Sequence, residues 1–407
     1  MSRLARYTAI VVLFAAGLGL LAVYALNIDY SAPGDTKVRD AAAAGGFGTV
    51  CIVGALLLIS GRLRSATRSF RFPPVWLGVV ALALAALAGV AAAHWDWLPL
   101  AEPFIAVVAL AGLFSAIARL VTRWPGAQSL QRRDVALATA WGMFAATGIA
   151  LVLQLAFAIL AVLAVLGGLA LVDTSLASSL IDRLSGTGGL DDLGSDLLQT
   201  LTVAVGVSAM YAIVAPLTEE FTKLLGVIFV QRSKVTTGYS AFVTGACVGL
   251  GFSVVETLGY ALAAGTAWPW LLLVRAPVAF IHVTASALAG YGWHRQRTTG
   301  GFRIVPYLIA AVLVHGAWNG LTVSAMLISA SLEDPNNPPV GAILGVLLIV
   351  ALLATVLTGC IAWTILAARK LGREANLSIQ QRLQEPRQAL DIPSIRLERS
   401  EVRGITT

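Results

Sequence analysis

The stretch GAILGVLLIVALLATVLTGCIAWTILAA, residues 341–368, contains no Asp, Glu, Lys or Arg. About 20 apolar residues in an α-helix are enough to cross a hydrocarbon core about 30 Å thick, so this stretch can span a membrane. Similar runs recur along the chain, which has 407 residues, 58% of them hydrophobic and 12% charged. A soluble domain carries about 25% charged residues. The sequence therefore predicts an all-α, polytopic transmembrane helix bundle.

Ten segments are predicted to span the membrane. Their approximate limits are 8–26, 41–60, 75–93, 104–118, 135–171, 209–230, 238–264, 271–292, 304–326 and 341–368. Cytoplasmic loops of membrane proteins carry an excess of Lys and Arg, which tests the count. Every second loop contains Lys or Arg, for example Arg62, Arg132 and Arg295, whereas the loops at 94–103 and 327–340 contain neither. This alternation predicts ten spans with both termini in the cytoplasm.

The chain is expected to have four regions. These are an accessory transmembrane region at 1–196, a core at 197–330, a final span at 331–368 and a polar cytoplasmic tail at 369–407. The net charge of +7 comes from basic residues in short segments between apolar runs, not from one basic patch. We therefore interpret the charge as a topology signal, expect the lipid bilayer as a partner and expect no nucleic acid.

Ionisable residues are concentrated at mid-membrane depth in four consecutive spans of the second half. Such residues are costly in a bilayer and by default indicate a functional site. The stretches are TEEFTKLLGV (218–227), GFSVVETLGY (251–260), VRAPVAFIHVTASALAGYG (274–292) and VLVHGAWNGL (312–321). With a rise of about 1.5 Å per residue, Glu219 and Glu220 are expected about 15 Å from the cytoplasmic end of their span, near the midplane. His282 and His315 are expected at a similar depth, and Glu256 somewhat nearer the outer face.

Within each span the polar residues share one helix face. Four residues separate Glu219 from Lys223, Glu256 from Tyr260 and His315 from Asn319, and seven separate Arg275 from His282. Residues at these spacings lie on the same side of a helix. We expect each span to direct this polar stripe inward, with His282 and His315 facing the glutamate pair across a small hydrated cavity. We expect Arg275 to line the outer mouth of that cavity and to pair with Glu256.

Single elements of this pattern also have structural explanations. A Glu–Lys pair or a buried His is often a packing feature, and Gly245, Gly249, Gly251 and Gly259 are typical of close helix packing. Three carboxylates and two histidines at similar depth instead indicate an acid–base site, a metal site or a proton path. A proton- or ion-coupled transporter would need the same groups, and a non-catalytic immunity or scaffold protein is a further alternative.

The motifs EE-xx-K, E-xxx-Y, R-x6-H-x7-G and H-xxx-N occur in that order on separate spans. This order resembles the PrsW family of intramembrane proteases, which is related to the CAAX prenyl endopeptidases and the bacterial Abi proteins. The resemblance covers roughly residues 200–325 and departs at Thr257, where Asn would be expected. It implies that 197–330 is a catalytic core in a multi-pass protein of the bacterial inner or plasma membrane. It also implies an intramembrane endopeptidase whose substrates are membrane-embedded or single-pass proteins such as anti-sigma factors.

Peptide hydrolysis requires an activated water and a group that stabilises the oxyanion. Either Glu219 or Glu220 can serve as the base. His282 and His315 can position the water or stabilise the oxyanion, and Asn319 can assist. The predicted catalytic residues are Glu219, Glu220, Glu256, His282, His315 and Asn319, with Lys223, Tyr260 and Arg275 in support.

A metal is the alternative within this class. Two histidines and a glutamate are the protein ligands of some catalytic zinc sites, which makes Glu220, His282 and His315 possible metal ligands. The sequence contains no HExxH motif to support a zinc protease of that type. We therefore expect either no cofactor or a single divalent metal such as zinc, and no small-molecule cofactor. The choice between glutamate-type and metal-type hydrolysis stays open at this point.

Overall fold

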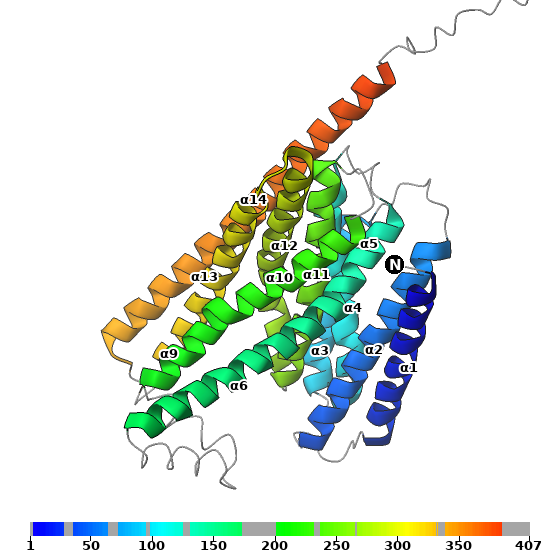
Figure 1. Ribbon diagram of the computed structural model, residues 1–407. Helices are drawn as coiled ribbons and strands as arrows, with labels where there is room; N and C mark the ends of the chain where they lie inside the picture. The colour runs from blue at the N-terminus through cyan, green and yellow to red at the C-terminus, as the bar shows by residue number, and fades with distance from the viewer. Residues whose placement is uncertain are drawn as a thin grey trace, which may run out of the picture.

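The protein is described here by a computed structural model that covers residues 3–27, 36–63, 72–94, 98–124, 131–172, 201–231, 237–264, 267–330, 332 and 338–384. All regular elements within these residues are helices (Figure 1). In chain order they are α1 (Arg3–Asn27), α2 (Thr36–Leu63), α3 (Val75–His94), α4 (Leu98–Thr122), α5 (Arg132–Ala140), η2 (Trp141–Ala146), α6 (Thr147–Val172), α9 (Leu201–Ala209), η3 (Met210–Val214), α10 (Ala215–Gln231), α11 (Gly238–Ala263), α12 (Trp268–Thr299), α13 (Val305–Ala330) and α14 (Val340–Gln384). The predicted all-α helix bundle is confirmed.

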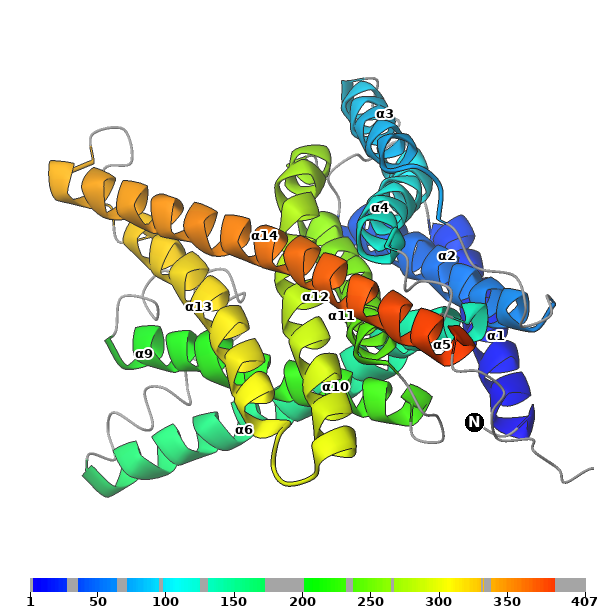
Figure 2. The same ribbon diagram turned by 90° about the horizontal axis from the view of Figure 1, so that it is seen from above.

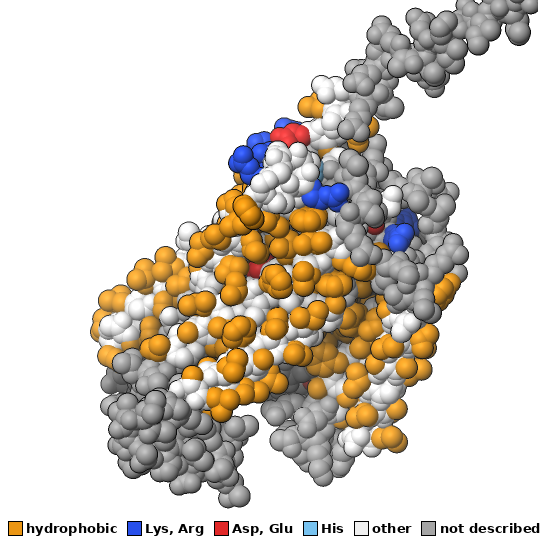
Figure 3. All heavy atoms as spheres, viewed as in Figure 1, with side chains coloured by type: hydrophobic (Ala, Val, Ile, Leu, Met, Phe, Trp, Pro, Cys, Tyr) orange, Lys and Arg blue, Asp and Glu red, His pale blue; other side chains and the backbone are white. Residues whose placement is uncertain are grey.

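Eight helical stretches within the described residues are long and apolar enough to cross a membrane. They are Tyr7–Asn27, Val75–Ala92, Phe104–Thr122, Arg132–Ala164, Gly238–Ala261, Trp268–Thr299, Val305–Ala330 and Val340–Gln381, and α2 adds a shorter apolar segment, Ala41–Leu56. Basic side chains gather at one end of the largely apolar surface (Figure 3). The chain is a multi-pass membrane protein. The count of ten spans and the cytoplasmic position of both termini stay predictions.

The helices α11 and α12 form the centre of the bundle. Seen from above, α3 and α4 lie to one side of them and α13 to the other, while α14 crosses over them (Figure 2). The helix α11 contacts α12, α10, α4, α5, η2 and α14. Helices from both halves of the sequence therefore pack around α11.

Small residues allow the central helices to approach closely. A Cβ at several glycines would lie closer than 3.0 Å to a backbone carbonyl oxygen of a neighbouring helix, namely Gly245 against Ser286, Gly249 against His282, Gly251 against Thr139 and Gly290 against Ala241. Gly at a helix interface permits such backbone contact. The packing role predicted for Gly245, Gly249 and Gly251 is confirmed. It is wrong for Gly259, because a Cβ placed there would meet no neighbouring heavy atom of the described residues within 4 Å.

A π-helical turn, η3, directly precedes the helix that carries the glutamate pair. Pro216 follows this turn and has no N–H to donate to the carbonyl of Ala212. Gly316 of α13 packs against that carbonyl, since a Cβ at Gly316 would lie closer than 3.0 Å to the Ala212 oxygen. This contact brings the neighbouring residue, His315, up against the start of α10. π-helical turns often occur at functional sites.

Candidate active site

Glu219 and Glu220 lie in the second turn of α10 and share one buried cation. The Nζ atom of Lys223 lies 3.2 Å from Glu219 Oε2 and 2.8 Å from Glu220 Oε1. The side chains of Lys223 and Glu220 are fully buried, and that of Glu219 is 9% exposed. Burial of an unpaired charge is strongly unfavourable, so the two carboxylates and the ammonium depend on one another.

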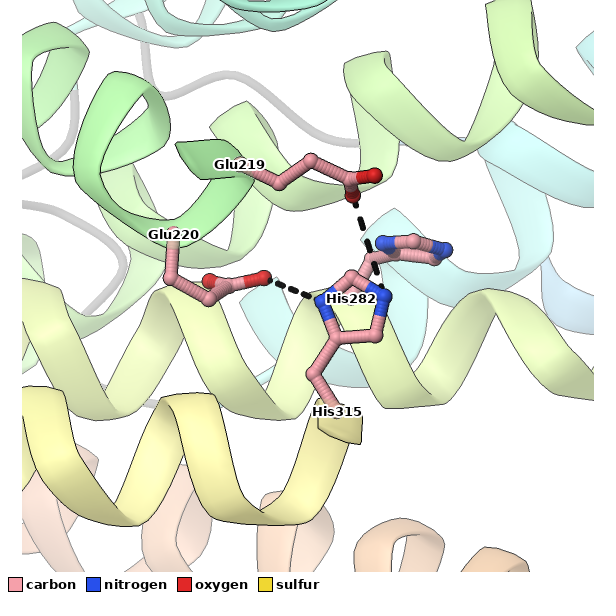
Figure 4. A group of neighbouring side chains, drawn as sticks. All are labelled: Glu219, Glu220, His282 and His315. Carbon is pink, nitrogen blue, oxygen red and sulfur yellow. Dashed lines mark hydrogen bonds and ion pairs between the residues drawn. The ribbon is translucent and has the colours of Figure 1, made fainter. Parts of the chain in front are cut away.

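Both histidines reach this group from other helices. His315 of α13 places Nδ1 2.9 Å from Glu220 Oε1 and Nε2 3.7 Å from Glu219 Oε2 (Figure 4). His282 of α12 places Nδ1 3.0 Å from Lys223 Nζ. The two imidazole rings meet edge to face with their centroids 4.7 Å apart. The prediction that His282 and His315 face each other and the glutamate pair is confirmed, at direct-contact distances, while the small hydrated cavity between them stays a prediction.

Glu256 of α11 lies behind His282. Its Oε2 atom is 2.7 Å from His282 Nε2 and 3.2 Å from Arg275 Nη2, which confirms the predicted pair with Arg275. A carboxylate bound to one imidazole nitrogen fixes the orientation of the ring and directs the other nitrogen to its target. Glu256 is therefore placed where it can orient His282. Tyr260 is 42% exposed and lies beside Arg275, whose Cζ is 4.0 Å from the Tyr260 ring centroid. The prediction that Tyr260 faces the buried cluster is therefore wrong.

Asn319 lies one helical turn from His315 but is not brought into the cluster. Its Nδ2 atom donates a hydrogen bond to the carbonyl of Tyr211 at 3.1 Å and so ties α13 to η3. Thr257, the position where the sequence departs from the family motif, is buried, and its hydroxyl oxygen has no hydrogen-bond partner among the described residues.

The geometry thus places two carboxylates and two imidazoles, Glu219, Glu220, His282 and His315, with one ligand atom each, within 4.8 Å of one another. A family model described as "PrsW family intramembrane metalloprotease" matches residues 131–356. The chain belongs to this family. It is therefore an intramembrane endopeptidase, and the resemblance noted from the sequence motifs is confirmed. No match was found among curated proteins or among solved structures.

The PrsW match begins at residue 131 and so includes α5, η2 and α6, upstream of the motifs that carried the resemblance. This part supplies a site residue that the sequence reasoning missed. Gln154 of α6 donates from Nε2 to Glu219 Oε1 at 3.1 Å. Its signal was visible, because Gln154 is the only amide or charged residue in the apolar stretch 147–172.

Two more contacts with the cluster were missed. Ser286 of α12 donates from Oγ to Glu220 Oε2 at 3.4 Å. The Phe252 ring of α11 lies under Lys223, with Nζ 3.9 Å from the ring centroid. Ser286 stands four residues after His282, so the spacing rule used for the other pairs also places it on the inward face. Phe252 gave no such signal, because an aromatic residue in a membrane helix is usually a packing residue.

The donor chemistry of the cluster fits a divalent metal. Two imidazole nitrogens and carboxylate oxygens are the ligands of catalytic zinc sites, and all three predicted ligands, Glu220, His282 and His315, belong to the group. The Lys223 ammonium contacts ligand atoms of Glu219, Glu220 and His282. A metal bound here would therefore have to share these atoms with the Lys223 ammonium or displace the ammonium from them.

Proposed function

We propose that this PrsW-family protein hydrolyses a peptide bond of a membrane-embedded or single-pass protein, using a water molecule activated by Glu219. The observation that supports the proposal is the buried group of two carboxylates and two histidines within 4.8 Å of one another. Peptide hydrolysis in a membrane requires such a polar group away from lipid, because isolated polar groups are costly there.

Accessibility favours Glu219 over Glu220 as the base. Glu220 is fully buried, and its oxygens are occupied by Lys223, His315 and Ser286. Glu219 retains 9% of its side-chain exposure, and Glu220 retains none, so of the two carboxylates Glu219 is the nearer to the surface of the bundle. A general base has to lie within hydrogen-bond reach of the proton that it removes. Glu220 then serves to hold His315 and Lys223 in place.

The place where that water binds follows from the positions of His315 and Glu219. With His315 Nδ1–H donating to Glu220, Nε2 is left as an acceptor 3.7 Å from Glu219 Oε2. Two acceptors this close bind the two protons of one water. Glu219 accepts one proton while the water oxygen adds to the peptide carbonyl, and Glu219 then returns the proton to the leaving nitrogen. We propose the Asn319 amide, released from the Tyr211 carbonyl, as a donor to the oxyanion.

When bound, a divalent metal such as zinc would be held by Glu220, His282 and His315 and would act as a Lewis acid on the peptide carbonyl. The tasks of Glu219, Glu256 and Arg275 are the same with or without it. Glu219 handles the proton, Glu256 orients His282, and Arg275 supports Glu256. Lys223 keeps the carboxylates together.

The proposal extends to the substrate and to the parts of the chain. The family resemblance supports substrates of the anti-sigma-factor type, anchored by a single span in a bacterial inner or plasma membrane. We further propose that residues 197–330 are the catalytic core, 1–196 an accessory region, 331–368 a final span and 369–407 a cytoplasmic tail.

The function is tested by reconstituting the full chain in proteoliposomes with single-pass proteins tagged at both ends. Glu219→Gln keeps the shape of the side chain and removes the base, so cleavage should fall by about 100-fold or more. Glu374→Gln, at an exposed position of α14, is the matched control and should cleave normally. Wild-type cleavage by Glu219→Gln and by Glu220→Gln alike would show that neither is the base.

The same assay separates the two types of hydrolysis. A zinc chelator that abolishes cleavage, with recovery on adding zinc, would establish the metal-type reaction. Cleavage that is unaffected by the chelator would establish the glutamate-type reaction. Absence of cleavage of every substrate, together with proton uptake into the vesicles, would instead support a coupled transporter.

A further inference from the structure

Gln154 is a polar residue in the apolar membrane helix α6, so it is expected to have a polar partner. Its neighbours on α6 face outward, with Leu151 60% and Leu155 63% exposed. Polar side chains in a membrane helix are costly and usually pair with another polar group. The partner of Gln154 is the carboxylate of Glu219, so this amide is turned toward the active site and away from lipid.

The contact fixes the second oxygen of Glu219. Gln154 Nε2 donates to Glu219 Oε1 at 3.1 Å, while Lys223 Nζ lies 3.2 Å from Oε2. Gln154 Nε2 also donates to the Thr218 hydroxyl at 3.4 Å, and that hydroxyl donates in turn to the backbone carbonyls of Val214 in η3 and Ala215 in α10. The carboxylate is therefore held by one donor on each oxygen, and the two donors come from different helices.

A second contact keeps Gln154 in register with α10. At the start of η2, Trp141 donates from Nε1 to the carbonyl of Thr222 at 3.0 Å. Gly226 leaves room for the Trp141 ring, since a Cβ there would lie closer than 3.0 Å to it. The run α5–η2–α6 is thus attached to α10 at Thr222 and again at Thr218 and Glu219. These attachments hold the amide of Gln154 where it meets the carboxylate.

We infer that Gln154 is a positioning residue for the hydrolytic reaction. Its amide holds Glu219 Oε1, so that Oε2 stays directed toward His315 Nε2 and the place of the attacking water. This inference rests on the proposed role of Glu219 as the base. Gln154 itself does not touch the reacting atoms.

The first test needs no substrate. Gln154→Met has nearly the same length and removes the donor, and Leu155→Met on the same helix is the matched control. Full-length protein in detergent is treated with dicyclohexylcarbodiimide, which reacts with membrane-embedded carboxyl groups, and adducts are assigned by mass spectrometry. Loss of one hydrogen bond of ordinary strength should raise the labelling rate of Glu219 by about 2- to 10-fold. Labelling of Glu256 should not change, and an unchanged rate at Glu219 would overturn the inference.

The second test uses whichever tagged single-pass protein the wild type cleaves. A displaced base slows the chemical step, so Gln154→Met should lower kcat by about 10- to 100-fold. KM should stay within about twofold, because an interaction with the base contributes to the chemical step and not to substrate binding. Gln154→Asn, which keeps the amide one methylene short, should give an intermediate kcat and replaces the Met variant if that variant does not fold.

Glu219→Gln in the same preparation separates two failures. If Glu219→Gln is inactive and Gln154→Met is unaffected, the positioning role is wrong and the proposed base stands. If Glu219→Gln cleaves like the wild type, the proposed base is wrong, and Gln154 has no base to position. A rise in KM with unchanged kcat in Gln154→Met would assign the residue to substrate binding and would also overturn the inference.

Discussion

The helices α11 and α14 are both long enough to cross a membrane, but the less apolar of the two is the more buried. Their most apolar 18-residue windows have mean hydropathies of 1.6 in α11 and 2.9 in α14. In α11, 94% of this stretch is buried inside the bundle, and in α14 only 6% is buried. This is the reverse of the trend in soluble proteins, where the most apolar segments form the core.

The difference follows from the solvent. Lipid tails are as apolar as leucine, so apolar side chains have little preference between lipid and a helix neighbour, and packing of small residues and polar contacts decide association. The helix α11 has Gly245 and Gly249 for close approach and Glu256 for a polar partner, whereas α14 has no charged residue from Val340 to Ala368. Hydropathy therefore locates the membrane, and small and polar residues locate the site within it.

The largest effect is expected when the ammonium of Lys223, which lies between the two buried carboxylates, is removed. Lys223→Met leaves Glu219 and Glu220 without their shared ammonium, and loss of one partner of a buried ion pair costs about 3–5 kcal/mol. Lys370→Met on the exposed surface of α14 is the matched control and should be close to neutral. Denaturant titration in detergent micelles measures both. Equal stability of the two variants would mean that the buried charges do not depend on one another.

Zinc sharpens the same prediction. If the cluster binds a metal, zinc should raise the unfolding temperature of Lys223→Met more than that of the wild type, because no ammonium competes for the Glu219, Glu220 and His282 atoms. Thermal unfolding with and without zinc measures the difference. If zinc stabilises neither protein, this cluster does not hold a metal.

The next effect concerns the carboxylate behind His282. Glu256→Gln removes the charge that orients the imidazole, and replacement of such supporting partners typically lowers activity by about 10- to 100-fold. Tyr260→Phe is the control, since it keeps the ring beside Arg275 and removes only the hydroxyl. Rates of substrate cleavage measure both variants. Equal losses would indicate that Tyr260, and not only Glu256, supports the site.

The packing side of the comparison is tested within one helix. Gly249→Ala places a methyl group against the backbone of His282, whereas Gly259→Ala meets no heavy atom within 4 Å among the described residues. Overpacking costs about 1–3 kcal/mol, so Gly249→Ala should destabilise the protein by that amount and Gly259→Ala should not. Unfolding in detergent micelles compares the two. A neutral Gly249→Ala would show that α11 and α12 can separate without cost.

The sequence predicted those features that depend on one helix at a time. Helical spacing placed Glu219 with Lys223 and directed His282 and His315 inward, and the cost of polar groups in lipid required that these faces meet. The pair of Arg275 with Glu256 followed from the same reasoning and is confirmed at 3.2 Å.

What the sequence could not predict depends on which helices are neighbours. Gln154 is 65 residues from Glu219 in the chain, and no spacing rule connects them. Asn319 shares the face of His315 but meets the carbonyl of Tyr211, because η3 lies beside α13 at that height. Tyr260 shares the face of Glu256 but is 42% exposed and packs against the Arg275 guanidinium. Periodicity gives the face of a residue, and only the packed bundle gives its partner.

The smallest expected effect is at the junction between the central helices and α14. Thr284 of α12 lies with Oγ1 2.7 Å from Thr364 Oγ1 and donates to the carbonyl of Cys360 at 3.2 Å. These two contacts link the buried helix α12 to the lipid-facing helix α14. Interhelical hydrogen bonds in membranes contribute on average only about 0.6 kcal/mol, so Thr284→Val, which keeps the shape, should cost about that much.

The control for this change is Thr355→Val, whose exposed hydroxyl donates within α14 to the carbonyl of Ala351. The double variant Thr284→Val/Thr364→Val should be no less stable than Thr284→Val alone, because the hydroxyl pair is already lost. Unfolding in detergent micelles measures the stability of the wild type and of these three variants. A loss of more than about 2 kcal/mol in Thr284→Val would exceed the largest value expected for one such bond. The hydroxyl contacts, and not the close packing of side chains, would then be what holds α14 to the core.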